Sequence, residues 1–186
     1  MSDKDFGRMR TSNSLLFYSL AALALPIAGH AADPNAPLRQ TIQRNYNIMN
    51  NAMAHRDFNT VASYYDPDFV TIDKAGDYNP SGREQLRELY KKLADVEGYG
   101  LKATLKGHDK VLSLKVVAGG VVVIDKSDFT GRITAPNGNV YEYHSAGRSR
   151  DYWAKKGSQY ILTQSRILDG HSSTKLNGEV VETAQP

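Results

Sequence analysis

Apolar residues recur at helical spacing in the first part of the chain. Between residues 38 and 53 the successive spacings are four, four, three and four, which places one apolar stripe on a helix of about 18 residues. The stripe consists of Leu38, Ile42, Tyr46, Met49 and Met53. Asp57 then caps a short second helix, which stops at Asp66-Pro67-Asp68 because proline cannot continue a helix.

A third helix and a run of strands follow. Ser81-Gly82-Arg83-Glu84 has the form of a capping box, in which the serine and glutamate side chains bind amides at the start of a helix. Asn137-Gly138 is a hairpin signal, since both residues tolerate a positive φ. Helices first and long antiparallel strands second indicate an α+β fold, with three N-terminal helices packed on a curved antiparallel sheet. The predicted strands cover residues 101–118 (interrupted near 107–109), 121–134, 140–154 and 159–168.

The N-terminal residues have the features of an export signal. An apolar run over residues 15–28 follows Lys4, Arg8 and Arg10, and Gly29-His30-Ala31 supplies the small residues that a signal peptidase needs. Residues 1–31 are therefore predicted to be a signal peptide that is cleaved after Ala31, with either Met1 or Met9 as the start. The run falls short of the roughly 20 residues that span a bilayer, so no stable membrane anchor is expected. The protein is expected in the periplasm or outside the cell.

The remaining chain fits one domain. Residues 32–37 are predicted to be a linker, residues 38–168 the folded domain, and the polar residues 169–186 a disordered tail. Cysteine is absent, which excludes a disulfide scaffold. The basic residues are scattered and do not alternate with aromatic residues, so nucleic-acid binding is not expected. No histidine pair has the spacing of metal ligands, and neither a metal nor a cofactor is predicted.

Taken together, the motifs resemble those of the nuclear transport factor 2-like superfamily, in its SnoaL-like (DUF4440-type) branch. The resemblance covers about 130 residues, and it implies a cone-shaped fold around a pocket, together with a homodimer formed through the outer face of the sheet. The superfamily includes isomerases, dehydratases, cyclases and binding modules. The resemblance rests on Asp57-Phe58, on residues 65–70 leading to Asp73 and Gly76, on residues 81–84, on residues 148–153 and on Tyr160.

Ketosteroid isomerase, a distant member, implies roles for two aspartates. By its pattern Asp73 falls on the position of the general base, and Asp151 falls on the position of a neutral acid that donates a hydrogen bond. Two carboxyl groups in one apolar pocket have their pKa values pushed apart by burial and repulsion. Met49 occupies the position of the oxyanion tyrosine and can donate nothing. Tyr46 lies about one turn earlier on the same stripe and is the possible substitute.

Each of these residues also has an ordinary structural interpretation. Asp73 could bind amides of its own turn, and Asp151 could form an exposed ion pair with a neighbouring arginine. If Asp151 points inward, so do Trp153 and, on an unbroken strand, Tyr143. A bulge at Gly147 would instead turn His144 inward. The residues predicted to bind a substrate are Tyr46, Met49, Tyr65, Tyr143, His144 and Trp153.

Two functions remain open at this stage. The first is a pocket protein that binds a small apolar molecule without transforming it. The alternative is a cofactor-free acid/base enzyme of the isomerase, dehydratase or cyclase type, with Asp73 and Asp151 as catalytic residues. Because Met49 removes a donor that the enzyme comparison needs, the sequence favours binding.

Overall fold

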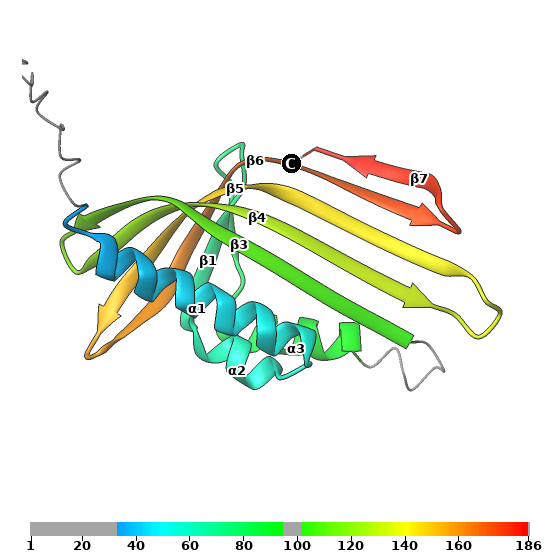
Figure 1. Ribbon diagram of the computed structural model, residues 1–186, viewed down its shortest axis with the longest axis horizontal. Helices are drawn as coiled ribbons and strands as arrows, with labels where there is room; N and C mark the ends of the chain where they lie inside the picture. The colour runs from blue at the N-terminus through cyan, green and yellow to red at the C-terminus, as the bar shows by residue number, and fades with distance from the viewer. Residues whose placement is uncertain (1–32, 95–101, 186) are drawn as a thin grey trace, which may run out of the picture. The chain divides into compact units, whose positions relative to one another are not determined.

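The computed structural model of this protein describes residues 33–94 and 102–185. These residues form helices and strands in the predicted α+β order, with the helices on one face of a curved sheet (Figure 1). The helices are α1 (Ala36–Ala54), α2 (Phe58–Ser63) and α3 (Arg83–Ala94). The strands are β1 (Tyr65–Ile72), β2 (Tyr78–Pro80), β3 (Lys102–Val117), β4 (Gly120–Thr134), β5 (Val140–Lys156), β6 (Gln159–Leu176) and β7 (Glu179–Ala184). The predicted signal peptide lies outside the described residues.

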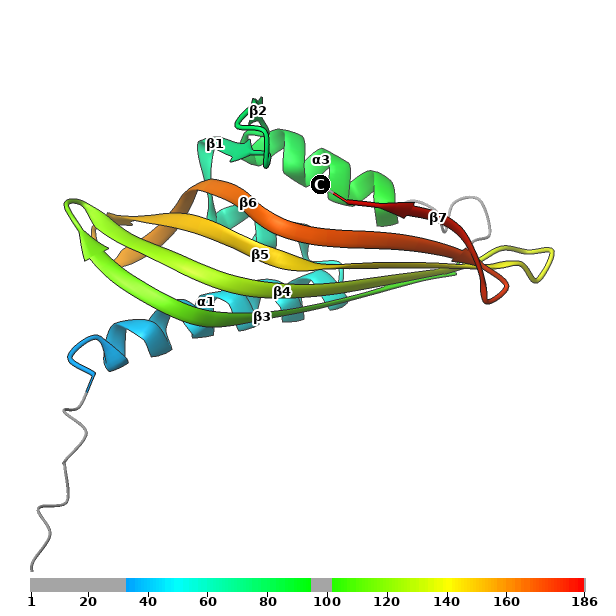
Figure 2. The same ribbon diagram turned by 90° about the horizontal axis from the view of Figure 1, so that it is seen from above.

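The strands form one sheet in the order β2-β1-β6-β5-β4-β3, with β7 paired to β6 as well. β6 is long enough to bind β1 along one part of its edge and β7 along another (Figure 2). The β1–β6 pair is parallel, whereas the other pairs are antiparallel. A parallel pair needs a long connection, and here the chain between β1 and β6 includes α3 and further strands.

The helices bury the stripes that the sequence predicts. Ile42, Tyr46, Met49 and Met53 of α1 are buried. Asp57 caps α2 by accepting a hydrogen bond from the amide of Thr60 at 3.1 Å, as predicted. The hydrogen bonds of the predicted capping box are not seen among the described residues: the Ser81 hydroxyl donates to the carbonyl oxygen of Asn79, and the Glu84 carboxylate pairs with Arg87. The Ser81 amide is held by β1 through the carbonyl oxygen of Phe69, and this fixes the serine in the strand-like segment before α3.

The sheet departs from the sequence prediction in two places. β3 runs without interruption through residues 107–109, and its irregularity lies instead between Val111 and Ser113. Residues 169–184, predicted to be part of a disordered tail, complete β6 and form β7. The turn between these strands contains Asn177 and Gly178 at φ of 52° and 91°, so it is a second Asn-Gly hairpin. The polar composition of residues 169–186 led to the prediction of disorder although the Asn-Gly pair was present.

The core lies between α1 and the sheet. Trp153, Ile42, Val121 and Val123 are fully buried and belong to one apolar cluster. Within the described residues, no helix has both the length and the apolar character needed to cross a membrane. A cavity adjoins this core, and Tyr46, Met49, Phe69 and Leu162 belong to both the core cluster and the cavity wall.

Candidate functional site

A cavity of about 710 Å³ opens between the helices and the inner face of the sheet. All three helices and every strand except β2 contribute to its wall, which is mostly apolar. The apolar part includes Met49, Met53, Tyr65, Phe69, Tyr90, Phe129, Tyr143 and Leu162. A volume of this size is typical of small-molecule sites, which fall between roughly 300 and 1,000 Å³.

Three aspartates from adjacent strands line one part of this cavity. Asp109 lies on β3, Asp125 on β4 and Asp151 on β5. Cross-strand register brings them together, because Asp125 pairs with Ser149, two residues before Asp151, and Val111 pairs with Asp125. Asp125 is 2% exposed and Asp151 is 4% exposed, so both carboxyl groups are withdrawn from water.

Two side chains of α1 reach down to this row. The Tyr46 hydroxyl donates to Oδ2 of Asp151 at 2.6 Å, and the Asn50 amide donates to Oδ2 of Asp109 at 2.8 Å. Asn50 can approach because Gly107 faces it, and a Cβ at Gly107 would overlap the Asn50 side chain. These two hydrogen bonds therefore hold α1 against β5 and β3 at the polar part of the cavity.

Ser149 connects two of the carboxyl groups. Its hydroxyl oxygen lies 2.5 Å from Oδ1 of Asp125 and 2.6 Å from Oδ1 of Asp151. A hydroxyl carries a single proton and can donate to only one of these oxygens. The other hydrogen bond needs a proton on a carboxyl group, so this geometry requires either Asp125 or Asp151 to be protonated.

The pKa values agree with this proton count. Burial, followed by the charge of Asp151, raises the pKa of Asp125 to about 8. Burial also raises the pKa of Asp151, although hydrogen bonds from Ser149, Ser165 and Tyr46 oppose the shift. Burial raises the pKa of Asp109 as well, against its hydrogen bonds with Asn50 and Asp125. The three carboxyl groups thus hold protons at a pH where exposed aspartates do not.

Of the predicted site residues, Asp151, Tyr46, Met49, Tyr65 and Tyr143 line the cavity. Asp151 is buried and has no exposed ion pair, so the ion-pair interpretation is wrong; the arginine nearby, Arg148, binds Asp169 instead. Tyr46, the possible substitute for the oxyanion tyrosine, donates its hydroxyl proton to Asp151.

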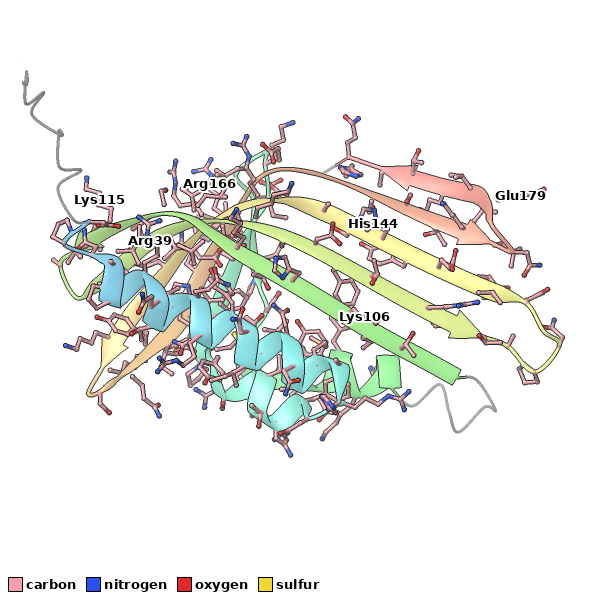
Figure 3. All side chains as sticks on the ribbon, viewed as in Figure 1. Arg39, Lys106, Lys115, His144, Arg166 and Glu179 are labelled. Atoms are coloured by element: carbon pink, nitrogen blue, oxygen red, sulfur yellow. The ribbon has the colours of Figure 1, made fainter. Side chains whose placement is uncertain are left out.

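Trp153 and His144 lie elsewhere. Trp153 is fully buried behind the cavity, where its indole N–H donates to the Tyr46 hydroxyl at 3.2 Å. β4 and β5 pair without a shift past Gly147, so the strand keeps its alternation and Tyr143 rather than His144 points inward. His144 lies on the outer face with its ring 3.3 Å from Asp128. Figure 3 labels His144, and it shows Arg166 on the side of the sheet away from α1.

Asp73 is not brought to this cavity. Its Oδ1 accepts hydrogen bonds from the amides of Gly76 and Asp77, both at 2.9 Å, within the turn between β1 and β2. The cavity wall formed by the described residues does not include Asp73. The local turn interpretation is therefore confirmed, and the predicted convergence of Asp73 and Asp151 does not occur.

Sequence reasoning missed Asp109, Asp125 and Asn50. Asp125 is in phase with Val121 and Val123, but Val122 and Ile124 are also apolar, so the pattern did not say which face was inner. Asp109 fell in the segment predicted to interrupt β3. Within the part of the chain that the structure describes, no group of three or more His, Cys, Asp or Glu side chains is arranged to hold a metal ion.

No protein-family model matches the chain, and no curated protein matches it. Solved structures do resemble it. A putative scytalone dehydratase from Novosphingobium aromaticivorans superposes with a TM-score of 0.54 at 12% identity, covering 82% of this chain and 94% of that one. A type 2 hexachlorocyclohexane dehydrochlorinase (LinA) gives 0.51 at 12% identity, with 81% and 89% covered. Aln2 from a Streptomyces species gives 0.53 at 16% identity, with 72% and 91% covered.

These similarities span nearly the whole length of each neighbour, and they agree with the order of helices and strands described above. Identities of 12–16% are informative about the fold alone. The chain has the nuclear transport factor 2-like fold, which the SnoaL-like proteins share.

Proposed function

We propose that this protein binds a small molecule with a largely apolar body in the cavity between the helices and the sheet. The observation that carries the proposal is the composition of the wall, in which aromatic and aliphatic side chains surround a few converging polar groups. Among these polar groups are the buried carboxyl groups of Asp109, Asp125 and Asp151, which would fix the orientation of the ligand. Two structural neighbours named for a dehydratase and a dehydrochlorinase are consistent with a small-molecule pocket.

The chain contains a natural reporter for this binding. Trp153 is its only tryptophan, and the indole is hydrogen-bonded to Tyr46, which lines the cavity. A ligand that contacts Tyr46 or Asp151 should change the fluorescence of Trp153. We therefore expect a screen of small aromatic and alicyclic compounds against the purified chain to give saturable changes in tryptophan emission.

Two variants locate the binding. Ser145 lines the cavity, whereas Glu142 on the same strand lies beside Arg132, and neither Glu142 nor Arg132 is part of the cavity wall that the described residues form. Ser145→Phe should fill part of the cavity and weaken binding at least about tenfold, whereas Glu142→Phe places the same ring outside and should leave it unchanged. A screen without a saturable signal, or equal binding by both variants, would refute the proposal.

A second candidate function is cofactor-free proton transfer, and the bridge formed by Ser149 favours it. A proton shared between Asp125 and Asp151 in a dry site could pass to or from a bound substrate, and a pKa near neutrality suits a general acid or base. Asp125 would take the role predicted for Asp73. Deuterium exchange into a bound carbonyl compound, catalysed by the protein and lost in Asp125→Asn, would support this function over simple binding.

Two further proposals rest on the sequence. We propose that the protein acts after export, with residues 1–31 removed, which mass spectrometry of the secreted or periplasmic protein would test. We also propose a homodimer, which sedimentation would test. The charges on the outer face of the sheet restrict where the two-fold axis of this dimer can lie. Lys110 is paired with Lys126 there, and Arg150 is paired with Arg166. A two-fold axis through this region would bring like charges together.

A further inference from the structure

We infer that the ligand of this cavity is an organic cation, in which a protonated amine is attached to an apolar body. The amine would lie against Asp109 and Asp125, and the body would lie along the aromatic wall. The inference rests on the proposed binding function and specifies the chemical class of its ligand.

The first argument is the charge of the cavity. The hydrogen-bond partners of the three carboxyl groups include Asn50, Tyr46, Ser149 and Ser165, all of them uncharged. Arg148, which reaches the wall, is bound to Asp169. The hydrogen bonds to the three carboxyl groups therefore come from uncharged side chains, with His108 as a basic neighbour of Asp109, and a cationic ligand would supply a counter-charge in direct contact.

The second argument is the number of hydrogen-bond donors. Asp125 and Asp151 both contact the hydroxyl of Ser149, which carries one proton for two carboxyl groups, and the pKa of Asp109 also reflects a hydrogen bond with Asp125, which needs a proton on one of these two acids. Asp109 and Asp125 lie diagonally on neighbouring strands, since Asp109 pairs with Ser127 and Asp125 pairs with Val111. An ammonium group has three N–H donors and can bond both carboxylates at once.

Binding would exchange one proton for the cation. The ammonium group keeps its three protons, the carboxylic acid O–H bond breaks, and the released proton goes to the buffer. Charge balances, because a neutral acid becomes the carboxylate that pairs with the ammonium group. The cavity wall carries other titratable groups from every layer around it. They are Tyr46 from α1, Tyr65 from β1, Tyr90 from α3, Asp128 from β4, Tyr143 and Arg148 from β5, and Asp169 and His171 from β6, while His108 of β3 lies near Asp109. Burial raises the pKa of Tyr46, Tyr65 and Tyr90, so these three stay neutral during the exchange.

The third argument is the aromatic wall of the cavity. Tyr65 of β1 and Tyr90 of α3 line it near the carboxyl groups, since the charge of Asp109 contributes to the raised pKa of both tyrosines. Phe129 and Tyr143, whose ring centroids are 6.1 Å apart, line it farther along β4 and β5. Aromatic rings bury an apolar body and attract a cation within about 6 Å of a ring face. A cation bound at the carboxyl groups could therefore lay its apolar body along this wall.

The test compares three probes that share one apolar body: 4-phenylbutylamine, 4-phenylbutanol and 4-phenylbutanoate. Calorimetric titration of the full chain at about pH 7, in two buffers with different ionisation enthalpies, gives both the affinity and the number of protons released. We expect the amine to bind at least about tenfold more tightly than the alcohol, because its hydrogen bonds are charge-assisted, and to release about one proton. The carboxylate should bind most weakly.

Variants assign the effect to the carboxyl groups. Asp125→Asn and Asp109→Asn should each reduce the preference for amine over alcohol by about tenfold and suppress proton release. Glu142→Gln removes a carboxylate from the outer face of β5 and should change neither quantity. The comparison of probes in the unaltered protein does not depend on any variant folding.

The outcomes separate this inference from the proposed function. If the alcohol or the carboxylate binds as tightly as the amine, the ligand is not a cation, while the proposed binding function stands. If all three fail to bind, the cation inference is overturned, and the proposed function is then decided by the fluorescence screen. If the amine binds without releasing a proton, the exchange with a protonated aspartate is wrong.

Discussion

Replacing Asp125 by asparagine should change how the stability of the protein depends on pH. The carboxyl group is buried, and its pKa in the folded protein is about 8, whereas an aspartate in the unfolded chain has a pKa of about 3.9. Between these two values the folded protein holds a proton that the unfolded chain has lost. The free energy of unfolding that this group contributes is therefore fully present below about pH 4 and is lost as the pH rises toward about 8.

The magnitude follows from proton linkage. One proton changes the free energy of unfolding by about 1.4 kcal/mol per pH unit, which amounts to about 4 kcal/mol between roughly pH 5 and pH 8. This is an upper value, because Asp125 and Asp151 share a proton and the pair titrates as a unit. Asparagine has nearly the same shape as the protonated acid, and its amide N–H can donate to the Ser149 oxygen where the acid O–H does, yet it does not titrate.

Urea denaturation at about pH 5, 6, 7 and 8 measures the effect. The free energy of unfolding of the natural protein, minus that of Asp125→Asn, should decrease steadily as the pH rises. The variant should therefore be most stable relative to the natural protein at the highest pH. Glu142→Gln, which alters an exposed carboxylate, should differ from the natural protein by a nearly constant amount. A constant difference for Asp125→Asn as well would show that Asp125 is ionised in the folded state, and the reasoning about the shared proton would then fail.

Three other substitutions test the surroundings of the carboxyl groups. Tyr46→Phe removes the donor to Asp151 and the acceptor of an indole N–H, and urea denaturation should show a loss of about 1–3 kcal/mol. Gly107→Ala places a methyl group against Asn50 and should cost about 1–3 kcal/mol through overpacking in the same measurement, while a smaller loss would mean that α1 shifts easily. Asp73→Asn should lower stability by about 1 kcal/mol or less and leave the ligand affinity found by fluorescence unchanged, because its carboxylate serves only the turn.

The sequence predicts those helices and turns that a single local pattern of residues specifies. The stripe from Leu38 to Met53 has the period of a helix, and α1 buries it as expected. Asn137-Gly138 makes its hairpin through positive φ at the glycine. Asn177-Gly178 forms the same kind of turn, but the polar residues around it suggested disorder. A polar composition indicates that a segment is exposed to solvent, and every residue of β7 is indeed exposed although β7 is an ordered strand. A hairpin at the edge of a sheet forms through backbone hydrogen bonds, and composition does not record these.

The site could be predicted only in part, because it depends on register between strands. The family resemblance placed Asp151 in the pocket as a neutral acid and Tyr46 as a possible oxyanion donor, but it did not predict that Tyr46 would donate to Asp151 itself. The link between them and Asp125 requires Asp125 to lie opposite Ser149, and strand pairing of this kind is not encoded in either strand alone. Asp73 illustrates the opposite error, since a strand-end aspartate matches both a catalytic base and a turn residue.

The hydrogen bonds of Asp151 also limit what this residue can do. Oδ2 accepts from Tyr46 and Oδ1 contacts Ser149, so each oxygen already has a partner before a ligand arrives. If a ligand binds as proposed, Asp151 would act on it chiefly through Ser149, and direct contact would fall to Asp125 and Asp109. Substitution of Asp151 should chiefly change the stability and the proton affinity of the cluster, because it leaves the Tyr46 hydroxyl without its acceptor and Ser149 with Asp125 alone. Substitution of Asp125 should chiefly change which ligands bind, and this difference separates the structural part of the cluster from the part that recognises a ligand.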